Sequence, residues 1–426
     1  MEIKYLHNLF LKCHSANTDT RKINPKDMFF ALKGENFNGN TFASKALEIG
    51  ASYAVIDEAI YANDDRYIVV DNVLETLQKL ASYHRDYLKI PIVALTGSNG
   101  KTTTKELINT VLSKKFKTVA TKGNLNNHIG VPLTLLSMNK ETEIGIVEMG
   151  ANHLKEIEFL VNIAKPDFGY ITNFGKAHLE GFGSVEGIVK GKSELYDFLD
   201  KYSKLIFVNG RDTKQMERTK RSKRFVFGTK KESQDVEIEF KDCNPNVTVN
   251  YDGLEIKSNL IGEYNFSNIC AAIAIGDYFK IEKTLIKEAI EEYIPANNRS
   301  QILNKNGKNI ILDAYNANPT SMEAAIRNLH KLTTKNKALI LGDMFELGDS
   351  SEEEHQNMVN LLVELGFQNI VLVGKNFYVT QSPDWIKKFE SFEDLKMGVN
   401  KETFTDSTIL IKGSRGMALE RVLEYI

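Results

Sequence analysis

One short glycine-containing segment constrains the fold of this chain more than any other. Residues 96–103 read Thr-Gly-Ser-Asn-Gly-Lys-Thr-Thr. Residues 90–95 before it are mostly apolar, as in a buried parallel strand, and apolar residues within 103–115 recur at helical spacing. A strand, a glycine turn and a helix together form a P-loop unit, in which backbone N–H groups and the helix N-terminus face a polyphosphate. We therefore predict a nucleotide site on an α/β sheet.

Two side chains of this segment have distinct expected roles. Lys101 would reach the terminal phosphates of the nucleotide, and the Thr102 hydroxyl would hold Mg²⁺. Leu95 stands where the usual G-x-x-x-x-G-K-S/T template has its first glycine, so this turn is a shorter form. An ordinary strand-to-helix turn would also contain glycine, but the flanking strand and helix favour nucleotide binding. The residues expected to line the phosphate site are Thr96, Gly97, Ser98, Asn99, Gly100, Lys101, Thr102 and Thr103.

Length, charge and cysteine content limit the class of protein. A chain of 426 residues is too long for one compact core, and we expect roughly two to four domains. Lys and Arg (54) nearly balance Asp and Glu (56), so the net charge of -2 gives no reason to expect a nucleic-acid or membrane partner. The 3 cysteines offer neither a disulfide framework nor a metal-binding spacing. With no signal-peptide pattern and no membrane-spanning run, we expect a cytoplasmic protein. We separately expect a monomer, although nothing in the sequence determines the oligomeric state.

Strand-like and helix-like segments alternate along most of the chain. Such alternation predicts α/β domains with mostly parallel sheets covered by helices. Residues 225–260 instead alternate apolar and polar side chains, so we expect antiparallel strands that extend the central sheet at its edge. The expected domains are residues 1–88, 89–296 and 297–426. Strand-like runs of the second and third domains are 144–147, 168–171, 205–208, 310–312, 338–341, 370–373 and 408–411.

Three residues beyond the P-loop segment are candidates for a metal site. Glu148 follows the run 144–147, where a carboxylate can be a second Mg²⁺ ligand, although a solvated acid at a strand end fits equally well. His178 could help to hold a second magnesium ion, whereas no His-Glu-x-x-His pattern or cysteine cluster indicates zinc. Lys192 by itself resembles a solvated helix lysine. A neutral lysine amine can also add carbon dioxide, and the anionic carbamate would bridge Mg²⁺ well.

Further candidates lie toward the C-terminus. Asn265 and Asn268 open a helix-like segment, where asparagine usually caps the helix but can also bind an adenine edge. Arg299 and Arg415 are candidate clamps for a phosphoryl group or a carboxylate, because guanidinium binds such anions bidentately. Asp313 directly follows a strand-like run, and ligands gather at the carboxyl ends of strands in open sheets.

Several separated segments resemble those of one family, the Mur ligases, which are ATP-dependent amide-forming enzymes of bacterial cell-wall precursor synthesis. Two C-terminal segments, 313–322 (DAYNANPTSM) and 342–348 (GDMFELG), are similar to the family member that adds D-alanyl-D-alanine. One departure is Tyr264, where relatives often carry histidine, which affects only the expected packing near adenine. The other segments that carry the resemblance are 18–21 (TDTR), 27–34 (DMFFALKG), 96–103, 123–133 (GNLNNHIGVPL) and 177–184 (AHLEGFGS).

The resemblance implies a three-domain fold and an ATP-dependent ligation. D-alanyl-D-alanine would be joined to the terminal carboxylate of UDP-N-acetylmuramoyl-tripeptide through an acyl phosphate. Lys101 would bind the β- and γ-phosphates, and Lys192 would be carbamylated. Two magnesium ions would be arranged by Thr102, Glu148 and His178, together with the carbamylated lysine.

The resemblance also implies residues for the two nucleotides. Thr20 and Arg21 would lie near the uridine nucleotide of the precursor, in the first domain. On the ATP side, Arg299 and Asp313 would approach from the third domain, and Arg299 would take part in catalysis. The residues implied near adenine are Asn265 and Asn268.

Two other functions are compatible with parts of the sequence. A member of the same family that adds the third amino acid would share the ATP site, but segment 313–322 argues against it. A P-loop switch or kinase would bind nucleotide without forming an amide, and would hydrolyse ATP without both substrates. The sequence leaves open whether the third residue of the tripeptide is lysine or a diamino diacid.

Overall fold

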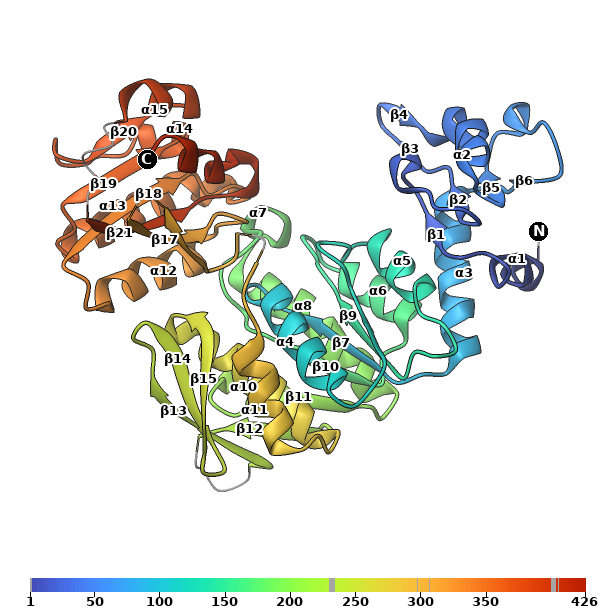
Figure 1. The fold of residues 1–426 in the computed structure, drawn as a ribbon, viewed down its shortest axis with the longest axis horizontal. Helices are drawn as coiled ribbons and strands as arrows, with labels where there is room; N and C mark the ends of the chain where they lie inside the picture. Colours follow the sequence, from blue (N-terminus) through green and yellow to red (C-terminus); the bar gives the residue numbers. More distant parts are fainter. Residues whose placement is uncertain (1, 230–233, 297, 306, 400–403, 405) are drawn as a thin grey trace.

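The computed structural model describes residues 2–229, 234–296, 298–305, 307–399, 404 and 406–426. In this part of the chain three large sheets follow one another, and Figure 1 shows them as three lobes, each with helices around a sheet. The predicted α/β fold with mostly parallel sheets is confirmed. The boundaries 1–88, 89–296 and 297–426 fall between the sheets, and we retain them as a proposal.

The first lobe, blue in Figure 1, is built on a four-stranded parallel sheet. Its elements are α1 (Ile3–Phe10), β1 (Ala16–Asn17), β2 (Met28–Phe30), β3 (Lys33–Gly34), β4 (Phe37–Asn38), α2 (Ala43–Ile49), β5 (Tyr53–Ile56), β6 (Tyr67–Val69) and α3 (Val73–Leu88). The strand order is β1-β2-β5-β6. Met28 and Phe30 of β2 pack with α1 and α3, and Phe29 packs with α2. The alternation of side chains along the strand thus buries both faces of the sheet.

The second lobe holds a nine-stranded sheet in the order β15-β14-β13-β12-β11-β10-β7-β9-β8. Its strands are β7 (Ile92–Thr96), β8 (Thr118–Ala120), β9 (Ile144–Glu148), β10 (Phe168–Ile171), β11 (Leu205–Asn209), β12 (Arg224–Gly228), β13 (Val236–Asp242), β14 (Asn246–Tyr251) and β15 (Leu254–Ile261). The pairs β13–β14 and β14–β15 are antiparallel and lie at one end of the sheet. The predicted antiparallel extension is therefore confirmed for β13, β14 and β15, whereas β12, within the same predicted region, pairs in parallel with β11 and β13.

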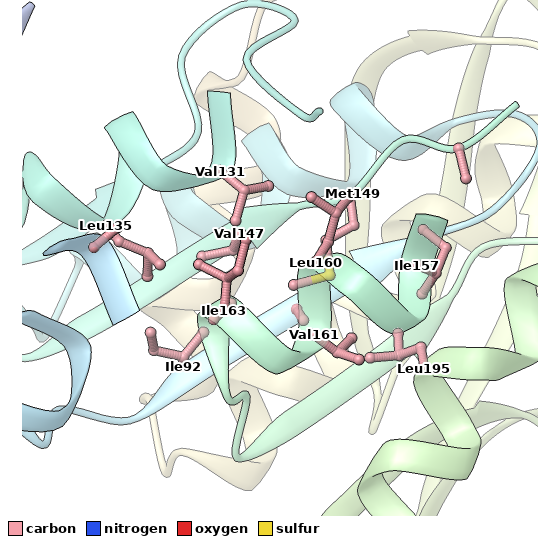
Figure 2. Close-up of a cluster of buried hydrophobic side chains, with 14 of the residues drawn as sticks. Ile92, Val131, Leu135, Val147, Met149, Ile157, Leu160, Val161, Ile163 and Leu195 are labelled. Atoms are coloured by element: carbon pink, nitrogen blue, oxygen red, sulfur yellow. The ribbon is translucent and has the colours of Figure 1, made fainter. Parts of the chain in front are cut away.

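Helices cover both faces of the nine-stranded sheet. They are α4 (Lys101–Ser113), α5 (Gly130–Leu136), α6 (Glu156–Ala164), α7 (Leu179–Phe182), α8 (Val185–Lys201), α9 (Thr213–Arg218), α10 (Phe266–Tyr278) and α11 (Lys283–Glu292). Val93 and Leu95 of β7 pack with α4 and α10 on one face, whereas Ile92 packs on the other face with α5, α6 and α8. Figure 2 shows part of the cluster around Ile92, in which Ile92 and Val147 lie among side chains of α5 and α6. The core on both faces fixes the position of β7 and of the loop after it.

Helix α3 joins the first lobe to the second. It packs against α1 and also contacts α5 and α6. Leu77 and Leu80 of α3 accordingly belong to the same apolar cluster as Ile92 of the central sheet. The helix begins where the Asn72 side chain accepts a hydrogen bond from the backbone N–H of Glu75, a typical N-cap.

The third lobe, orange to red in Figure 1, contains a six-stranded sheet in the order β16-β17-β21-β18-β19-β20. Only the β16–β17 pair is antiparallel among the described strands of this sheet. Its elements are β16 (Gln301–Lys305), β17 (Lys308–Asp313), α12 (Pro319–Lys331), β18 (Asn336–Gly342), α13 (Ser351–Glu364), β19 (Asn369–Val373), α14 (Lys375–Tyr378), β20 (Lys387–Phe389), α15 (Phe392–Gly398) and β21 (Ser407–Lys412). Asn318 begins α12 through a capping box with Ser321.

The P-loop helix begins earlier than the apolar pattern predicted. The apolar spacing marked residues 103–115, but α4 runs from Lys101 to Ser113. Gly100, with φ of 78°, ends the turn and lets the helix start at the next residue. No helix in the described part of the chain is both long and apolar enough to cross a membrane.

A buried histidine pair fastens the N-terminal helix to the rest of the protein and predicts an acid-sensitive fold. His7 Nε2 lies 2.9 Å from His84 Nδ1, and His84 Nε2 lies 2.9 Å from the Met138 carbonyl. Burial, followed by the charge of His84, lowers the pKa of His7 from 6.5 to about 4. Burial also lowers the pKa of His84. Between pH 6.5 and 4 the unfolded chain binds more protons than the folded chain, so stability falls as the pH drops through this window.

Thermal unfolding at a series of pH values tests this prediction. The melting temperature of the wild type should be highest above about pH 6.5 and should decline toward pH 4. His7→Phe keeps a ring in the pocket but removes one titrating group, so its decline should be shallower. His128→Gln, at an exposed position, is the matched control and should follow the wild type. Equal slopes for all three proteins would contradict the assignment.

Candidate active site

The P-loop segment lies at the carboxyl edge of the central sheet. β7 pairs in parallel with β9 and β10, and Leu95 is in register with Glu148 on one side and Tyr170 on the other. The Asn99 carbonyl accepts hydrogen bonds from Thr172 Oγ1 (2.6 Å) and Asn173 Nδ2 (2.9 Å). The turn after β7, the end of β9 and the turn after β10 therefore meet at one edge, where ligands bind in open sheets.

Lys101 points back over the P-loop. Its Nζ donates to the carbonyls of Gly97 (2.7 Å) and Ser98 (3.2 Å). Burial lowers the pKa of Lys101, and Arg299 also lowers it, while Glu148 acts in the opposite direction. The amine is thus held against the loop itself, where a P-loop lysine can reach the terminal phosphates.

Thr102 and Glu148 form a small, buried polar site next to the loop. Thr102 Oγ1 donates to Glu148 Oε1 (3.2 Å), which also accepts from Asn126 Nδ2 (2.8 Å). Glu148 is 1% exposed, so the alternative of a solvated acid is wrong. Its Oε2 is buried and has no hydrogen-bond partner among the described residues. A hydroxyl beside an unsatisfied carboxylate oxygen fits a Mg²⁺ ion, which prefers oxygen ligands.

Thr102 and Glu148 alone do not complete a magnesium shell. Within the described ranges no group of three or more His, Cys, Asp or Glu side chains could hold a metal. Mg²⁺ is usually held by one or two protein oxygens, waters and substrate phosphates rather than by an all-protein cage. The site therefore fits Mg²⁺ that arrives with a nucleotide.

His178 lies where the second and third lobes meet. It precedes α7 and has a left-handed backbone conformation, with φ of 54°. Its Nδ1 lies 2.5 Å from Oε2 of Glu346, which follows β18 in the third lobe. This close contact with His178 lowers the pKa of Glu346. Glu346 lies within the segment 342–348, but no local sequence pattern predicts this contact.

Lys192 is fully buried in α8, so its interpretation as a solvated helix lysine is wrong. Nζ donates to the Ala151 carbonyl (2.8 Å) and lies 5.0 Å from the centroid of the Phe182 ring. Burial, followed by the charge of Lys101, lowers the pKa of Lys192 well below its ordinary value. A lowered pKa increases the neutral amine, which is the form that can add carbon dioxide.

Asn265 and Asn268 lie close to the P-loop, with Asn268 next to Gly100. The helix cap expected from Asn265 is absent. Asn265 occupies the N-cap position of α10 without a side-chain capping bond. Its Nδ2 donates to the Ile261 carbonyl instead, and Asn268 Nδ2 donates to Asn265 Oδ1, both at 2.8 Å. Thr104 of α4 donates to Asn268 Oδ1 (3.0 Å). The two amides thus connect α10 with the P-loop helix.

Charged groups of the third lobe face this edge. The Asp313 carboxylate accepts hydrogen bonds from Lys412 Nζ (2.6 Å) and from the backbone N–H of Ser300 (3.0 Å). The Arg299 guanidinium carbon lies 3.6 Å from the centroid of the Tyr315 ring. Arg299 Nε is buried and has no hydrogen-bond partner in the described part of the structure, so it could bind an anion.

Most of the predicted site residues line one cavity of about 840 Å³ between the second and third lobes. Lys192 and the loop residues Thr96 and Gly97 do not line it. Thr20 and Arg21 lie in the first lobe, outside this cavity, and Arg21 pairs with Asp19. The predicted residues that line the cavity are Ser98, Asn99, Gly100, Lys101, Thr102, Thr103, Glu148, His178, Asn265, Asn268, Arg299, Asp313 and Arg415.

Comparison with known protein families covers nearly the whole chain. The model described as "Mur ligase family, catalytic domain" matches residues 12–85, "Mur ligase middle domain" matches 95–276, and "Mur ligase, glutamate ligase domain" matches 298–415. UDP-N-acetylmuramoyl-tripeptide–D-alanyl-D-alanine ligase of Bacillus subtilis is 34% identical over 96% of this chain and 92% of its own length. The chain belongs to the Mur ligase family.

Other relatives of this Mur ligase agree in sequence and fold. The Escherichia coli ligase of the same name is 31% identical over 97% of this chain and 93% of its own length. A crystal structure of MurF from Acinetobacter baumannii superposes with a TM-score of 0.86 at 30% identity, covering 99% of this chain and 98% of that one. MurF from Thermotoga maritima, solved with ADP, gives a TM-score of 0.80 at 27% identity, with 97% of each chain covered.

Gly100 of this Mur ligase provides a test of the nucleotide site. A Cβ at Gly100 (φ 78°) would lie 2.7 Å from Asn268 Oδ1, whereas one at Gly253 (φ 83°) would meet nothing within 4 Å. Alanine at either position carries about 1–2 kcal/mol of left-handed backbone strain. Only Gly100→Ala should also displace Asn268 and weaken Mg-ATP binding, by about ten- to a hundredfold.

Calorimetric titration with Mg-ATP, together with melting temperatures of both variants, measures these effects. Gly253→Ala is the control for backbone strain, because its glycine has a similar φ angle in the turn between β14 and β15. Equal nucleotide affinity in the two variants would show that contact with Asn268 plays no part in binding.

Proposed function

We infer that this Mur ligase joins D-alanyl-D-alanine to the terminal carboxylate of UDP-N-acetylmuramoyl-tripeptide. ATP is consumed, and the products are UDP-N-acetylmuramoyl-pentapeptide, ADP and phosphate, in peptidoglycan precursor synthesis. Relatives named for this reaction match the chain over nearly its full length. The structural observation that carries the proposal is the cavity in which the P-loop faces Arg299 and Asp313 of the third lobe.

The first chemical step brings two anions together. An oxygen of the tripeptide carboxylate attacks the γ-phosphorus of ATP, the bond to the β-phosphate oxygen breaks, and an acyl phosphate and ADP form. Lys101 and Arg299 supply positive charge around the reacting phosphate. Mg²⁺ held by Thr102 and Glu148, and a second ion beside His178, would stabilise negative charge on the phosphate oxygens.

The second step forms the amide. The uncharged amine of D-alanyl-D-alanine attacks the acyl carbon, phosphate leaves with one oxygen of the former carboxylate, and the proton lost by the nitrogen goes to phosphate or solvent. Water must be excluded while the acyl phosphate exists, which favours a closed arrangement of lobes. Asn318 Nδ2 donates to Asn99 Oδ1 (2.7 Å) across the two lobes, so the P-loop itself contacts the third lobe.

Lys192 is proposed to carry a carbamate. Its neutral amine would attack carbon dioxide, forming an N–C bond and releasing one proton to solvent. The resulting carbamate would be negatively charged, and could therefore serve as a ligand of Mg²⁺. Lys192 itself does not line the cavity. The lowered pKa and full burial of Lys192 support this chemistry, since both favour the uncharged amine.

The remaining assignments complete the proposal. Residues 1–88 would bind the UDP end of the precursor through Thr20 and Arg21, 89–296 would bind ATP, and 297–426 would bind the dipeptide and close on ATP. Asn265 and Asn268 would lie near adenine. We propose that the enzyme acts as a monomer in the cytoplasm.

A matrix of UDP-peptides and amine acceptors tests the function. ADP release should require both a UDP-tripeptide and D-alanyl-D-alanine, and the product mass should be that of the pentapeptide. Tripeptides ending in lysine and in a diamino diacid are compared as substrates. Hydrolysis of ATP without either substrate would favour a P-loop switch, and activity with a UDP-dipeptide and a single amino acid would favour the other ligase of the family.

A further inference from the structure

The contact between His178 and Glu346 joins two lobes at the cavity edge. His178 lies between β10 and α7 of the second lobe, and Glu346 follows β18 of the third. The side chains are 19% and 49% exposed, and their Nδ1 and Oε2 atoms are 2.5 Å apart. His178 lines the nucleotide cavity, whereas Glu346 does not. The carboxylate therefore contacts the imidazole from the third lobe, within electrostatic range of Lys101.

The backbone leading into Glu346 is fixed by buried polar groups of its own lobe. The N–H of Met344 donates to His355 Nε2 (3.0 Å), and the N–H of Phe345 donates to Ser414 Oγ (2.8 Å). Glu346 has φ of 63°, a left-handed conformation that non-glycine residues rarely adopt. Such a conformation persists only where the surrounding structure holds it. The third lobe thus fixes the backbone position from which this carboxylate extends to His178.

Residues next to His178 also bind the third lobe. The N–H of Lys176 donates to Thr320 Oγ1 (2.9 Å), and Lys176 Nζ lies 2.6 Å from Glu354 Oε1. The N–H of Glu180 donates to the Glu346 carbonyl (3.3 Å). These bonds exist only while the second and third lobes are in contact. The orientation of His178 therefore depends on the docking of the lobes.

We propose that Glu346 is a positioning residue, which fixes Nδ1 of His178 when the third lobe docks and leaves Nε2 as the nitrogen available to the cavity. The inference rests on the proposed role of His178 beside magnesium. A histidine that binds metal usually donates its other ring N–H to a carboxylate or carbonyl, which sets the tautomer and the ring direction. Here the carboxylate comes from a different lobe, so docking of the third lobe completes the metal site.

Imidazole nitrogen NMR of protein labelled with ¹⁵N-histidine tests the contact directly. The signals of His178 are assigned from their loss in His178→Gln. Glu346→Ala should shift the Nδ1 signal of His178 and leave the other histidine signals in place, and Glu346→Gln should give a smaller shift. Glu352→Ala removes an exposed carboxylate of the same lobe and should leave every histidine signal unchanged. Melting temperatures confirm that the variants are folded.

The Mg²⁺ dependence of binding of a non-hydrolysable ATP analogue gives the second readout. Glu346→Ala should weaken apparent Mg²⁺ affinity about 10- to 100-fold, and Glu352→Ala should not. If the imidazole signals and the Mg²⁺ affinity of Glu346→Ala equal those of the wild type, the proposal about Glu346 is overturned. This conclusion holds even if the wild type forms pentapeptide. Failure of the wild type to form pentapeptide would refute the proposed function instead, since the NMR measurement needs no turnover.

Discussion

Lys101→Ala should lower the rate of dipeptide-dependent ADP formation by about 100- to 1000-fold. Lys101 is the cation of the P-loop, and in the proposed first step two anions must approach each other beside it. Removing its charge leaves repulsion between the carboxylate and the γ-phosphate uncompensated. Lys101→Arg should also be impaired, because a planar guanidinium does not replace a compact ammonium close to the loop carbonyls.

Steady-state ADP formation with both substrates saturating measures this effect. Lys117→Ala is the matched control, because Lys117 is exposed and pairs with Glu141 away from the cavity. Its rate should equal that of the wild type. A Lys101→Ala protein that is folded and forms ADP at the wild-type rate would refute the assignment of the phosphate site.

Lys192→Ala should reduce ligation by a similar factor, about 100- to 1000-fold, through loss of the proposed carbamate. Short-chain carboxylic acids should restore part of the activity in a concentration-dependent way, because a small carboxylate can enter the space left by the side chain. Bicarbonate should restore the activity of Lys192→Ala only if it can occupy the same space as a small carboxylate. Lys190→Ala, two residues earlier on α8 and exposed, should behave as the wild type.

Two observations decide the lysine hypothesis. Intact mass of the wild type under mild conditions should show the addition of one carbon dioxide, and this addition should be missing in Lys192→Ala. A bare Lys192 amine in a fully active enzyme would contradict the carbamate. Rescue of Lys192→Ala by uncharged alcohols of the same size as the acids would show that packing, and not an anion, had been lost.

The sequence predicted those parts of the fold that depend on neighbouring residues. The strand, turn and helix around Gly100 follow from local apolar spacing and from a glycine that permits a positive φ angle. Each predicted strand of the second and third domains occurs in the structure. Glu148 follows a predicted strand, and parallel strands align their carboxyl ends, so the pairing of Leu95 with Glu148 puts this carboxylate beside the P-loop.

The sequence could not predict contacts made by distant segments. Lys192 is charged in isolation, and its burial depends on the Ala151 carbonyl and the Phe182 ring, which other elements bring to it. Asn265 does not cap its helix, because its amide satisfies the buried Ile261 carbonyl. Glu346 lies in a recognisable segment, but no local pattern shows that a third-lobe carboxylate meets His178.

The fate of the tripeptide's own carboxylate oxygens tests the central claim most directly. UDP-tripeptide labelled with ¹⁸O in its terminal carboxylate is incubated with the enzyme, Mg-ATP and D-alanyl-D-alanine, and the released phosphate is analysed by mass spectrometry. Attack of the carboxylate on ATP predicts one labelled oxygen in each phosphate, in step with pentapeptide formation. Pentapeptide formed together with unlabelled phosphate would contradict phosphorylation of the carboxylate, and with it the proposed purpose of the cavity between the lobes.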